Sequence, residues 1–279
     1  MPYIYRTVSA KEKSMKKRCI IIVLLALACL TLLFSGCGDT AESAPQPDLP
    51  EITVGCDDYQ PFSYLDANGQ LTGIDVELAE EAFSRIGYKP NFVVISWEDK
   101  NTLLNSGKID CIWSSFTMNG REDQYKWAGP YMRSKQVIVV NQDSDIYSLS
   151  DLEGKLIAVQ STTKPEDILR EHGSGLPEFR KVISVKKRDL IFTMLAKGYV
   201  DAAAAHITAV EQFTQDSELK FRILDEPLLA VGLGAAFDLN DGRGIESALN
   251  KAFAEMRSDG TTEQIIGKYL SDPEQYLED

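Results

Sequence analysis

Two successive series of alternating strand and helix patterns constrain the fold of this 279-residue chain more than any other feature. The first series begins at Glu51 and the second near residue 136. Alternating strands and helices are typical of an α/β sheet whose strands run mostly parallel. Two such series in succession predict two lobes.

The first series contains short apolar runs and one amphipathic helix. Ile52–Cys56 has the pattern of a buried strand, and Asn68-Gly69 predicts a hairpin turn because both residues tolerate positive φ. Apolar residues then recur at helical spacing from Ile74 to Ile86, and Gly87 ends that helix. We expect a strand over 91–95, a short helix near 98–106 and a strand over 109–113.

The second series is longer, and the chain after it is mostly helical from 243 to 270. We predict strands over 136–140, 155–159, 182–185, 200–205 and 219–224, and helices over 164–171, 189–197 and 207–214. Ligands of such sheets bind beyond the carboxyl ends of the strands. A ligand site is therefore expected at those strand ends.

The amino-terminal 36 residues predict export. Lys16-Lys17-Arg18 precedes a run without charge from Cys19 to Phe34, and Ser35-Gly36 follows it. A basic stretch, an apolar stretch and small residues are the parts of a secretory signal. A membrane anchor is the alternative, but the run is shorter than the ~20 apolar residues that span a bilayer. Met15 is an alternative start to Met1, since it directly precedes the basic stretch.

The segment Leu33-Phe34-Ser35-Gly36-Cys37 resembles the lipobox of bacterial lipoproteins. In that motif the cysteine is acylated and becomes the new amino terminus. The resemblance implies a lipoprotein signal peptide over 1–36 and a lipid on Cys37. Residues 37–50 are small, polar and rich in Pro, which is typical of a flexible tether. We expect an exported body that is anchored to the outer face of the cell membrane.

The chain is acidic, with 42 Asp and Glu against 29 Lys and Arg and a formal net charge of −13. Six Lys or Arg and one Glu fall within 1–36, so the chain after residue 36 carries a net charge of −18. Such a body stays soluble and is unsuited to binding nucleic acid or anionic lipid through a basic surface. We therefore exclude nucleic acid as a partner.

Two cysteines follow Cys37, namely Cys56 and Cys111, and each lies in a predicted strand. They could form one disulfide or remain buried thiols, and the sequence leaves both possibilities open. No CxxC pair and no Cys/His cluster points to a metal site. We predict neither a metal nor another cofactor.

Four groups of motifs follow one another along the body. They are DDYQPFSY (57–64), GIDVELA (73–79), GKID (107–110) with SFTMNGR (115–121) and WAGPY (127–131), and DLEGK (151–155) with AVQSTT (158–163) and GYVDA (198–202). In this order and spacing they resemble the family-3 extracellular solute-binding proteins, the amino-acid-binding components of ABC importers. The resemblance runs from about Glu51 to Tyr269.

This resemblance implies a two-lobed, periplasmic-binding-protein-like clamp of type II, in which each lobe is a mixed, mostly parallel sheet flanked by helices. Lobe one would comprise 51–131 plus 232–279 and lobe two 135–228, joined by two hinge strands. The implied function is capture of an amino acid or a related small carboxylate by lobe closure, without catalysis. The implied partners are that ligand and an ABC permease with its ATPase, and the implied state is a monomer.

Arg121 is the candidate that grips a ligand carboxylate. It follows the turn-like Met118-Asn119-Gly120, and its planar fork of donors suits a two-point contact with a carboxylate. Spacing alone also allows a solvated loop arginine, and the family resemblance favours the ligand. Ser115 and Thr117 lie at the end of the preceding strand. By themselves they are ordinary strand-end residues, and the resemblance implies that they contact the ligand.

Thr162 and Thr163 open a helix that Pro165 pre-sets, and Thr163 and Glu166 have the spacing of a capping box. Free N–H groups and the positive dipole end of a helix can bind a carboxylate. A helix cap and nothing more is the alternative. In the family the equivalent segment holds the ligand carboxylate, so the resemblance allows both roles.

Two aromatic residues, Tyr59 and Trp97, fall where the resemblance places rings against the ligand. Such rings shield polar contacts from water and stack on cationic or planar groups. The alternative is that both belong to the core. Trp113 and Trp127 are expected to serve packing, because each lies beside buried strand or turn positions.

The strand over 200–205 departs from the family where it ends, at His206. Amino-acid binders of the family carry an acidic residue there, which takes the α-ammonium of the ligand. A neutral imidazole can accept one hydrogen bond from an ammonium, and a protonated imidazole repels it. Either Asp57, Asp58 or Glu98 meets the ammonium, or the ligand lacks a free α-amine. A structural histidine is the third possibility.

Two other classes of function remain as alternatives. A few relatives of this fold are periplasmic dehydratases of cyclohexadienyl acids, and His206 near Asp57 or Glu98 could donate a proton. The sequence shows no Ser-His-Asp order, metal cluster or phosphate loop that supports catalysis. The other alternative is a ligand-sensing lipoprotein that signals to a membrane receptor. We expect the importer component and no enzyme.

Overall fold

The structure, a computed structural model, describes residues 49–171, 175–216 and 219–277. The predicted signal peptide, Cys37 and nearly all of the tether lie outside the described residues, so their roles stay predictions. Leu49–Asp279 forms one compact unit. None of the helices in its described part is long and apolar enough to cross a membrane.

One hydrogen-bonded sheet of nine strands runs through this unit in the order β4-β1-β5-β11-β6-β9-β7-β8, with β10 (Phe221–Ile223) beside β6. The strands at one end are parallel and comprise β1 (Glu51–Cys56), β4 (Lys89–Val94) and β5 (Cys111–Ile112). The parallel strands at the other end are β7 (Leu156–Gln160), β8 (Lys181–Val185) and β9 (Ala202–His206). The predicted α/β class is confirmed, with a mixed sheet: pairing is parallel among β1, β4 and β5 and among β7, β8 and β9, and antiparallel where β6, β10 and β11 join.

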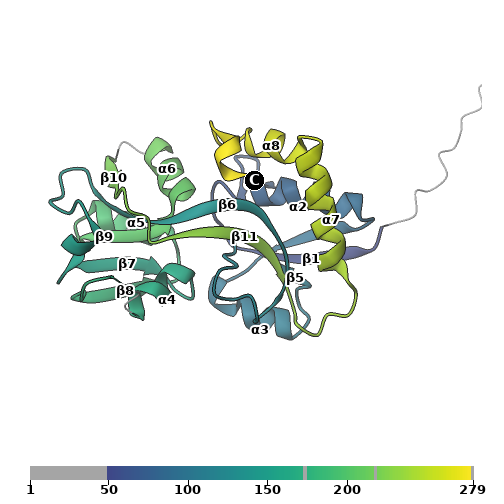
Figure 1. Cartoon of the computed structure of the whole chain (residues 1–279), viewed down its shortest axis with the longest axis horizontal. Coiled ribbons are helices and arrows are strands. Elements are labelled where there is room, and N and C mark those ends of the chain that lie inside the picture. Colours follow the sequence, from purple (N-terminus) through teal and green to yellow (C-terminus); the bar gives the residue numbers. More distant parts are fainter. Residues whose placement is uncertain (1–48, 172–174, 217–218, 278–279) are drawn as a thin grey trace, which may run out of the picture. The chain divides into compact units, whose positions relative to one another are not determined.

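Two long antiparallel strands join the two ends of the sheet, β6 (Lys126–Asn141) and β11 (Leu229–Phe237) (Figure 1). We call the part built on β1, β4 and β5 lobe one, and the part built on β7, β8 and β9 lobe two. Helices flank both lobes. Lobe one carries α2 (Ile74–Arg85), η1 (Trp97–Asp99), α3 (Lys100–Asn105), α7 (Ile245–Ser258), α8 (Thr261–Ile266) and η3 (Pro273–Tyr276). Lobe two carries η2 (Leu149–Leu152), α4 (Lys164–Arg170), α5 (Asp189–Ala196) and α6 (Ile207–Asp216).

The joining strands differ from the sequence prediction. The predicted strand over 136–140 covers only the last part of β6. Local patterns predict no strand at β11, where only the family resemblance implies a hinge strand between 228 and 232. Pro130 lies within β6 and donates no ladder hydrogen bond, and the pairing of β11 with β6 shifts register between Leu233 and Ala235. Because of these interruptions, apolar periodicity alone does not predict the full length of either strand.

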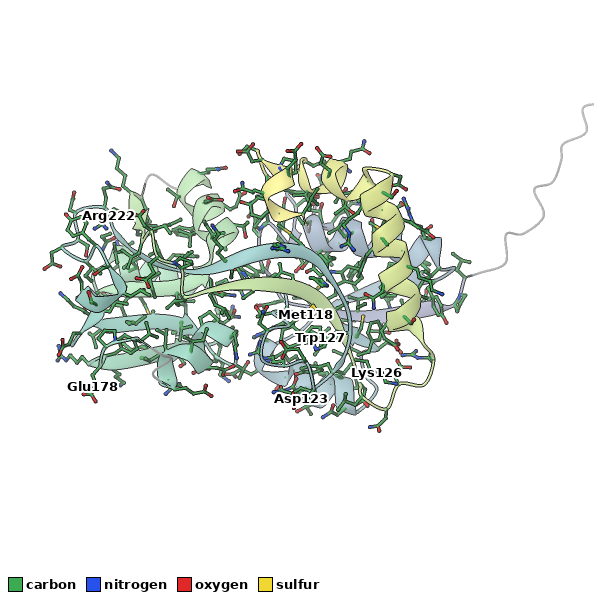
Figure 2. The ribbon with its side chains drawn as sticks, viewed as in Figure 1. Met118, Asp123, Lys126, Trp127, Glu178 and Arg222 are labelled. Atoms are coloured by element: carbon green, nitrogen blue, oxygen red, sulfur yellow. The ribbon has the colours of Figure 1, made fainter. Side chains whose placement is uncertain are left out.

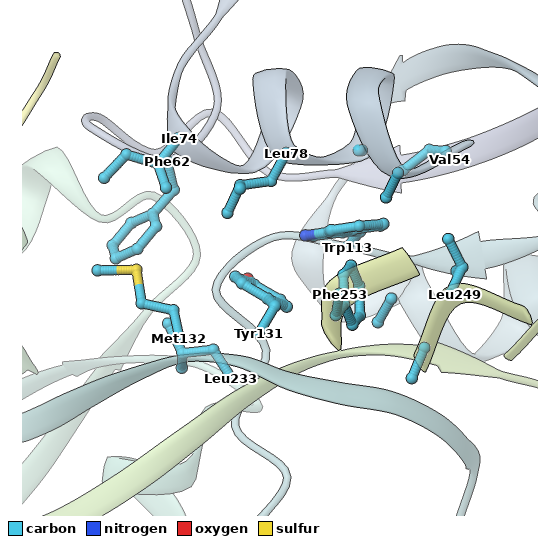
Figure 3. Packing of buried hydrophobic residues seen from close by; sticks show 14 of the residues in the cluster. Val54, Phe62, Ile74, Leu78, Trp113, Tyr131, Met132, Leu233, Leu249 and Phe253 are labelled. Atoms are coloured by element: carbon cyan, nitrogen blue, oxygen red, sulfur yellow. The ribbon is translucent and has the colours of Figure 1, made fainter. Parts of the chain in front are cut away.

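Lobe one buries a core of aromatic and aliphatic side chains around Trp113 (Figure 3). The Trp113 ring is fully buried and lies 5.3 Å from Tyr131 and 5.4 Å from Phe253, measured between ring centroids. Leu78 of α2 packs on this core from the side opposite Tyr131 in Figure 3. The predicted packing role of Trp113 is confirmed.

Lobe two has a core on each face of its sheet. Successive side chains of a strand point to opposite faces, so Ala202 and Ala204 of β9 belong to one core and Ala203 and Ala205 to the other. All four alanines are buried. Their small side chains therefore pack between the sheet and the helices that cover it.

A close approach at Gly73 fixes the loop that follows β1. The N–H groups of Ile74 and Asp75, in the first turn of α2, donate to the carbonyl oxygens of Pro61 and Phe62 at 2.9 Å. A Cβ at Gly73 would lie 2.3 Å from the Phe62 oxygen, and φ is 128° there, so only glycine fits. The predicted hairpin nearby is also confirmed, as β2 (Tyr64–Leu65) paired with β3 (Leu71–Thr72).

Both cysteines of the described unit are buried free thiols. Burial raises the pKa of Cys56 to about 12 and raises the pKa of Cys111 as well. Of the two possibilities left open by the sequence, the structure shows the unbridged one.

Candidate functional site

A cavity lies between lobe one and lobe two, with an empty volume of about 380 Å³ that includes its opening. Its lining consists of residues from both lobes and from β6. Lobe one contributes Tyr59, Trp97, Ser114–Thr117 and Arg121, β6 contributes Gln136, and lobe two contributes Gln160, Thr163–Pro165, Arg188 and Ala204–His206.

Most of the lining follows the carboxyl ends of parallel strands, as the sequence predicts. Ser115 and Thr117 follow β5, Gln160 ends β7 and His206 ends β9. The predicted site residues Tyr59, Trp97, Ser115, Thr117, Arg121, Thr163 and His206 all line this cavity. Asp57 and Thr162 do not line it, although each bonds to a residue of the opposite lobe.

A buried carboxylate holds the backbone at Ser115. The φ of Ser115 is 42°, and its N–H donates to Asp75 Oδ2 at 2.5 Å. The Tyr131 hydroxyl donates to the other oxygen of Asp75 at 2.8 Å. Asp75 is 1% exposed, and burial raises its pKa to about 7. Asp75 therefore fixes the backbone of Ser115, which lines the cavity, while Asp75 itself is not part of the lining.

Arg121 is buried, with 8% exposure, so the alternative of a solvated loop arginine is wrong. Its Nη2 donates to Asp167 Oδ2 of lobe two at 2.9 Å, while Nη1 makes only a 3.5 Å contact with the Thr117 carbonyl. The Trp127 ring holds this segment by donating from Nε1 to the Arg121 carbonyl at 2.9 Å. Trp127 and Met118 both pack against Gly234 of β11 (Figure 2). Trp127 thus has the packing role that we predict, and Nη1 of Arg121 retains donor capacity toward the cavity.

The predicted capping box at α4 does not form. Thr163 is the N-cap residue, but its hydroxyl donates to the Gln160 carbonyl at 2.7 Å, and Glu166 Oε2 accepts from the N–H of Thr162 at 2.5 Å. The other oxygen of Glu166 accepts from Arg170 at 2.9 Å, which turns the carboxylate away from Thr163. The helix start is therefore stabilised by a different set of bonds.

Lys100 of lobe one crosses to Thr162 of lobe two. Its Nζ donates to the Thr162 carbonyl at 3.1 Å and to the Thr162 hydroxyl at 2.9 Å, and it lies 4.8 Å from the centroid of the Trp97 ring. Burial, and next the charge of Arg121, lower the pKa of Lys100 to about 8. Trp97 itself is buried and meets Phe116 edge-on with centroids 5.3 Å apart.

Two of the three acidic candidates for an α-ammonium, Asp57 and Glu98, are already engaged. Asp57 Oδ2 accepts from Gln160 Nε2 at 2.8 Å and lies 3.5 Å from Arg188 Nη2, while Oδ1 accepts from the N–H of Asp58 at 3.0 Å. Glu98 pairs with Lys186 of lobe two at 2.6 Å. The side chain of Asp58 lines a separate cavity with Asp189, and burial, then Asp189, raise its pKa.

Both ring nitrogens of His206 are engaged inside the protein. Nδ1 lies 3.0 Å from Ser134 Oγ and Nε2 lies 2.7 Å from Gln136 Nε2. The Gln136 amide nitrogen can only donate, so Nε2 of the ring accepts from it and Nδ1–H donates to Ser134, which leaves the ring without a free acceptor. Burial and the nearby Arg188 lower the pKa of His206 to about 3, which keeps the imidazole neutral. The ring also packs against Tyr59 and Phe62, with centroids 6.1 and 5.9 Å apart.

Several cavity residues were not predicted as contacts from the sequence. Gln160 lies in the family motif AVQSTT, directly before Ser161-Thr162-Thr163, and its place in that motif could have predicted a contact with the ligand. Arg188 ends the run Lys186-Lys187-Arg188, which has the pattern of a solvated charged face. Gln136 and Lys164 carry no local signal, because only the approach of distant segments places them at the cavity.

Comparison with known proteins decides the family. The family model described as bacterial extracellular solute-binding proteins, family 3, matches residues 52–272. A histidine-binding periplasmic protein of Salmonella typhimurium is 33% identical over 251 residues, which cover 86% of this chain and 94% of that protein. The chain belongs to family 3 of the bacterial extracellular solute-binding proteins.

Solved structures with the same fold include other binding proteins. An ancestral arginine-binding protein bound to arginine has a TM-score of 0.72 and 28% identity, over 80% of this chain and 99% of that protein. An ancestral amino-acid-binding protein described as a precursor of cyclohexadienyl dehydratase has a TM-score of 0.70 and 28% identity, over 78% of this chain and 95% of that protein. The two-lobed clamp fold expected of this family-3 protein is thereby confirmed.

Proposed function

We propose that this family-3 protein captures an amino acid or a related small carboxylate between its lobes and delivers it to an ABC permease with an ATPase partner. The observation that carries the proposal is the buried Arg121 at the interlobe cavity. Its Nη1 retains donor capacity beside Thr117, and a guanidinium in a cavity sheltered from water binds a carboxylate strongly. The relatives named for histidine and arginine support the amino-acid class.

Lobe closure is the proposed mechanism. The lobes are joined by β6 and β11, and we assign lobe one to 51–131 plus 232–279 and lobe two to 135–228. Charged side chains bridge the lobes at Arg121–Asp167 and Glu98–Lys186. A ligand that touches both lobes favours the closed arrangement by its better fit to that state. We further propose that the protein acts as a monomer.

Catalysis on the same fold is the second candidate, and the relation to a dehydratase precursor is what raises it. His206 is the proton donor that this candidate needs. Its ring is buried and neutral, and both nitrogens are engaged by Ser134 and Gln136, so it is poorly placed to transfer a proton. Binding without catalysis, rather than dehydration or ligand sensing for a separate receptor, is therefore the function that we propose.

The full chain, purified in detergent, is expected to melt at a higher temperature with its ligand. A panel of amino acids and small carboxylates would be tested by thermal unfolding, and a ligand at ~100 times its Kd should add ~2.7 kcal/mol of stability. X-ray scattering with and without that ligand should show a smaller radius of gyration on binding. Absence of any thermal shift across the panel would refute capture, and consumption of the ligand over time would identify an enzyme.

We also propose that a lipid on Cys37 anchors the protein. The apolar run and small residues before Cys37 support this assignment. Cells fed radioactive palmitate should label the wild-type chain, and Cys37→Ala should lose all label because the acylated thiol is gone. Cys29→Ala is the matched control, since Cys29 lies within the predicted signal peptide. Label retained by Cys37→Ala would contradict the anchor.

A further inference from the structure

We propose that the interlobe cavity binds a small dianion, with one acidic group on Arg121 and the second on Arg188, and that it rejects ligands with a free α-ammonium. This inference rests on the proposed function, because it names the ligand class of the same site.

The charges at the cavity wall are cationic. Arg121, Lys164 and Arg188 line the cavity, and the described residues that line it include no Asp or Glu. Asp167 and Asp57, which are outside the lining, pair with Arg121 and Arg188 at 2.9 and 3.5 Å. A ligand placed among these cations is stabilised by negative charge.

Two buried donors at the cavity have no partner, and they mark where the second acidic group of the ligand would bind. Arg188 Nη1 and Trp97 Nε1 are buried polar atoms without a protein partner among the described residues, and both side chains line the cavity. Both atoms can only donate hydrogen bonds. Buried donors are costly unless they are paired, so they call for acceptor oxygens on the ligand.

Arg188 differs from Arg121 in its lobe and in its neighbours. Its guanidinium lies over the Tyr59 ring, and its Nη2 contacts Gln160 Oε1 and Asp57, which fixes its position. The free Nη1 edge is therefore held in place before a ligand arrives. Arg121 from lobe one and Arg188 from lobe two can then hold the two ends of one dianion, so the second acidic group also joins the lobes.

An α-ammonium finds no suitable partner at the position where the family resemblance expects an acid. His206 stands there, and its ring nitrogens are taken by Ser134 and Gln136. Gln136 Oε1 and the Tyr59 hydroxyl are fully buried, unpaired acceptors among the described lining residues, and both are neutral. A buried ammonium requires a counter-charge, which neutral oxygens do not supply.

Calorimetric titration of the full chain with matched ligand pairs tests this inference. The pairs are succinate with aspartate, and 2-oxoglutarate with glutamate. Each pair keeps both carboxylates and differs at the α-carbon, where hydrogen replaces the ammonium in succinate and a keto oxygen replaces it in 2-oxoglutarate. We expect the amine-free member to bind at least roughly tenfold more tightly. Tighter binding of aspartate and glutamate would overturn this inference and leave capture of carboxylates intact. If only monocarboxylate amino acids such as histidine bind, the dianion is also wrong, and if no member of the panel binds, the proposed function itself fails.

Two variants separate the two parts of the inference. Arg188→Gln should weaken dianions roughly 100-fold while leaving monocarboxylates within about threefold, because only the second acidic group loses its partner. Arg180→Gln, at an exposed position of lobe two, is the matched control.

His206→Asp should shift the binding preference within each pair toward the amine-bearing member by at least roughly tenfold. An unchanged dianion-to-monoanion ratio in Arg188→Gln, or an unchanged amine preference in His206→Asp, would contradict the corresponding part, and circular dichroism would show that each variant is folded.

Discussion

Arg121→Ala should lower the affinity for the ligand carboxylate by at least roughly 100-fold. Hydrogen bonds to charged groups contribute roughly 1.5–3 kcal/mol each, and alanine removes every donor of the guanidinium. Arg121→Lys keeps the charge but loses the planar fork, so its affinity should fall between those of alanine and wild type. Calorimetric titration with the best ligand of the panel gives the three affinities.

The empty protein should tolerate the same change. Asp167, the partner of Arg121, has a side chain that is 40% exposed, so the ion pair itself should contribute less than about 1 kcal/mol. The remaining loss of stability should come from the packing of the buried guanidinium against Phe116. Arg180→Ala, at an exposed position of lobe two, is the control for loss of a positive charge without loss of packing. Full affinity in Arg121→Ala would show that the ligand carboxylate lies elsewhere.

Asp75→Asn should remove a large pH dependence of stability. Burial raises the pKa of Asp75 to about 7 from its ordinary value of 3.8, so the folded protein holds a proton that the unfolded chain releases. Stability from this group is complete below about pH 4 and falls as the pH rises toward 7. A raised pKa of this size corresponds to about 4 kcal/mol across that interval, as an order of magnitude. An asparagine amide stays neutral and can keep both hydrogen-bond partners.

Urea unfolding at pH 4.5 and pH 8 measures this effect as a difference between two pH values. Wild type should lose more free energy of unfolding over this interval than Asp75→Asn does, because only the carboxyl ionises. Asp123→Asn is the control, since Asp123 is exposed on lobe one (Figure 2). Equal pH dependence in wild type and Asp75→Asn would show that Asp75 is ionised in the folded protein throughout this range.

Local patterns in the chain predicted many of the helices and strands. The apolar spacing from Ile74 gave α2 with its amino-terminal boundary, and Asn68-Gly69 gave the hairpin. These features depend on residues within one or two turns of each other. Local patterns did not reveal the joining strand β11, because Gly232 and Gly234 interrupt its apolar pattern and its strand geometry comes from pairing with β6 and β5. Only the family resemblance implied a hinge strand there.

The capping box at Thr163 shows the limit of spacing as a signal. Thr163 and Glu166 stand at the right distance in the chain, yet Arg170 and Ser184 bind the carboxylate and redirect it to Thr162. Ser184 belongs to β8, which the local sequence around Thr163 does not contain. Competition between nearby and distant partners decided the outcome.

By itself, the sequence determined the two α/β series, because strands, helices and turns are set by neighbours in the chain. The resemblance of its motifs to a family implied that Arg121, Ser115, Thr117, Tyr59 and Trp97 belong to one ligand site. The tertiary structure alone decided that Arg188 faces Arg121's cavity from lobe two and that Asp75 is buried under Ser115. It also decided that His206 is a satisfied, neutral ring. Burial and charge pairing depend on groups that are far apart in sequence, so the local sequence does not reveal them, and our proposal for the ligand class rests on these groups.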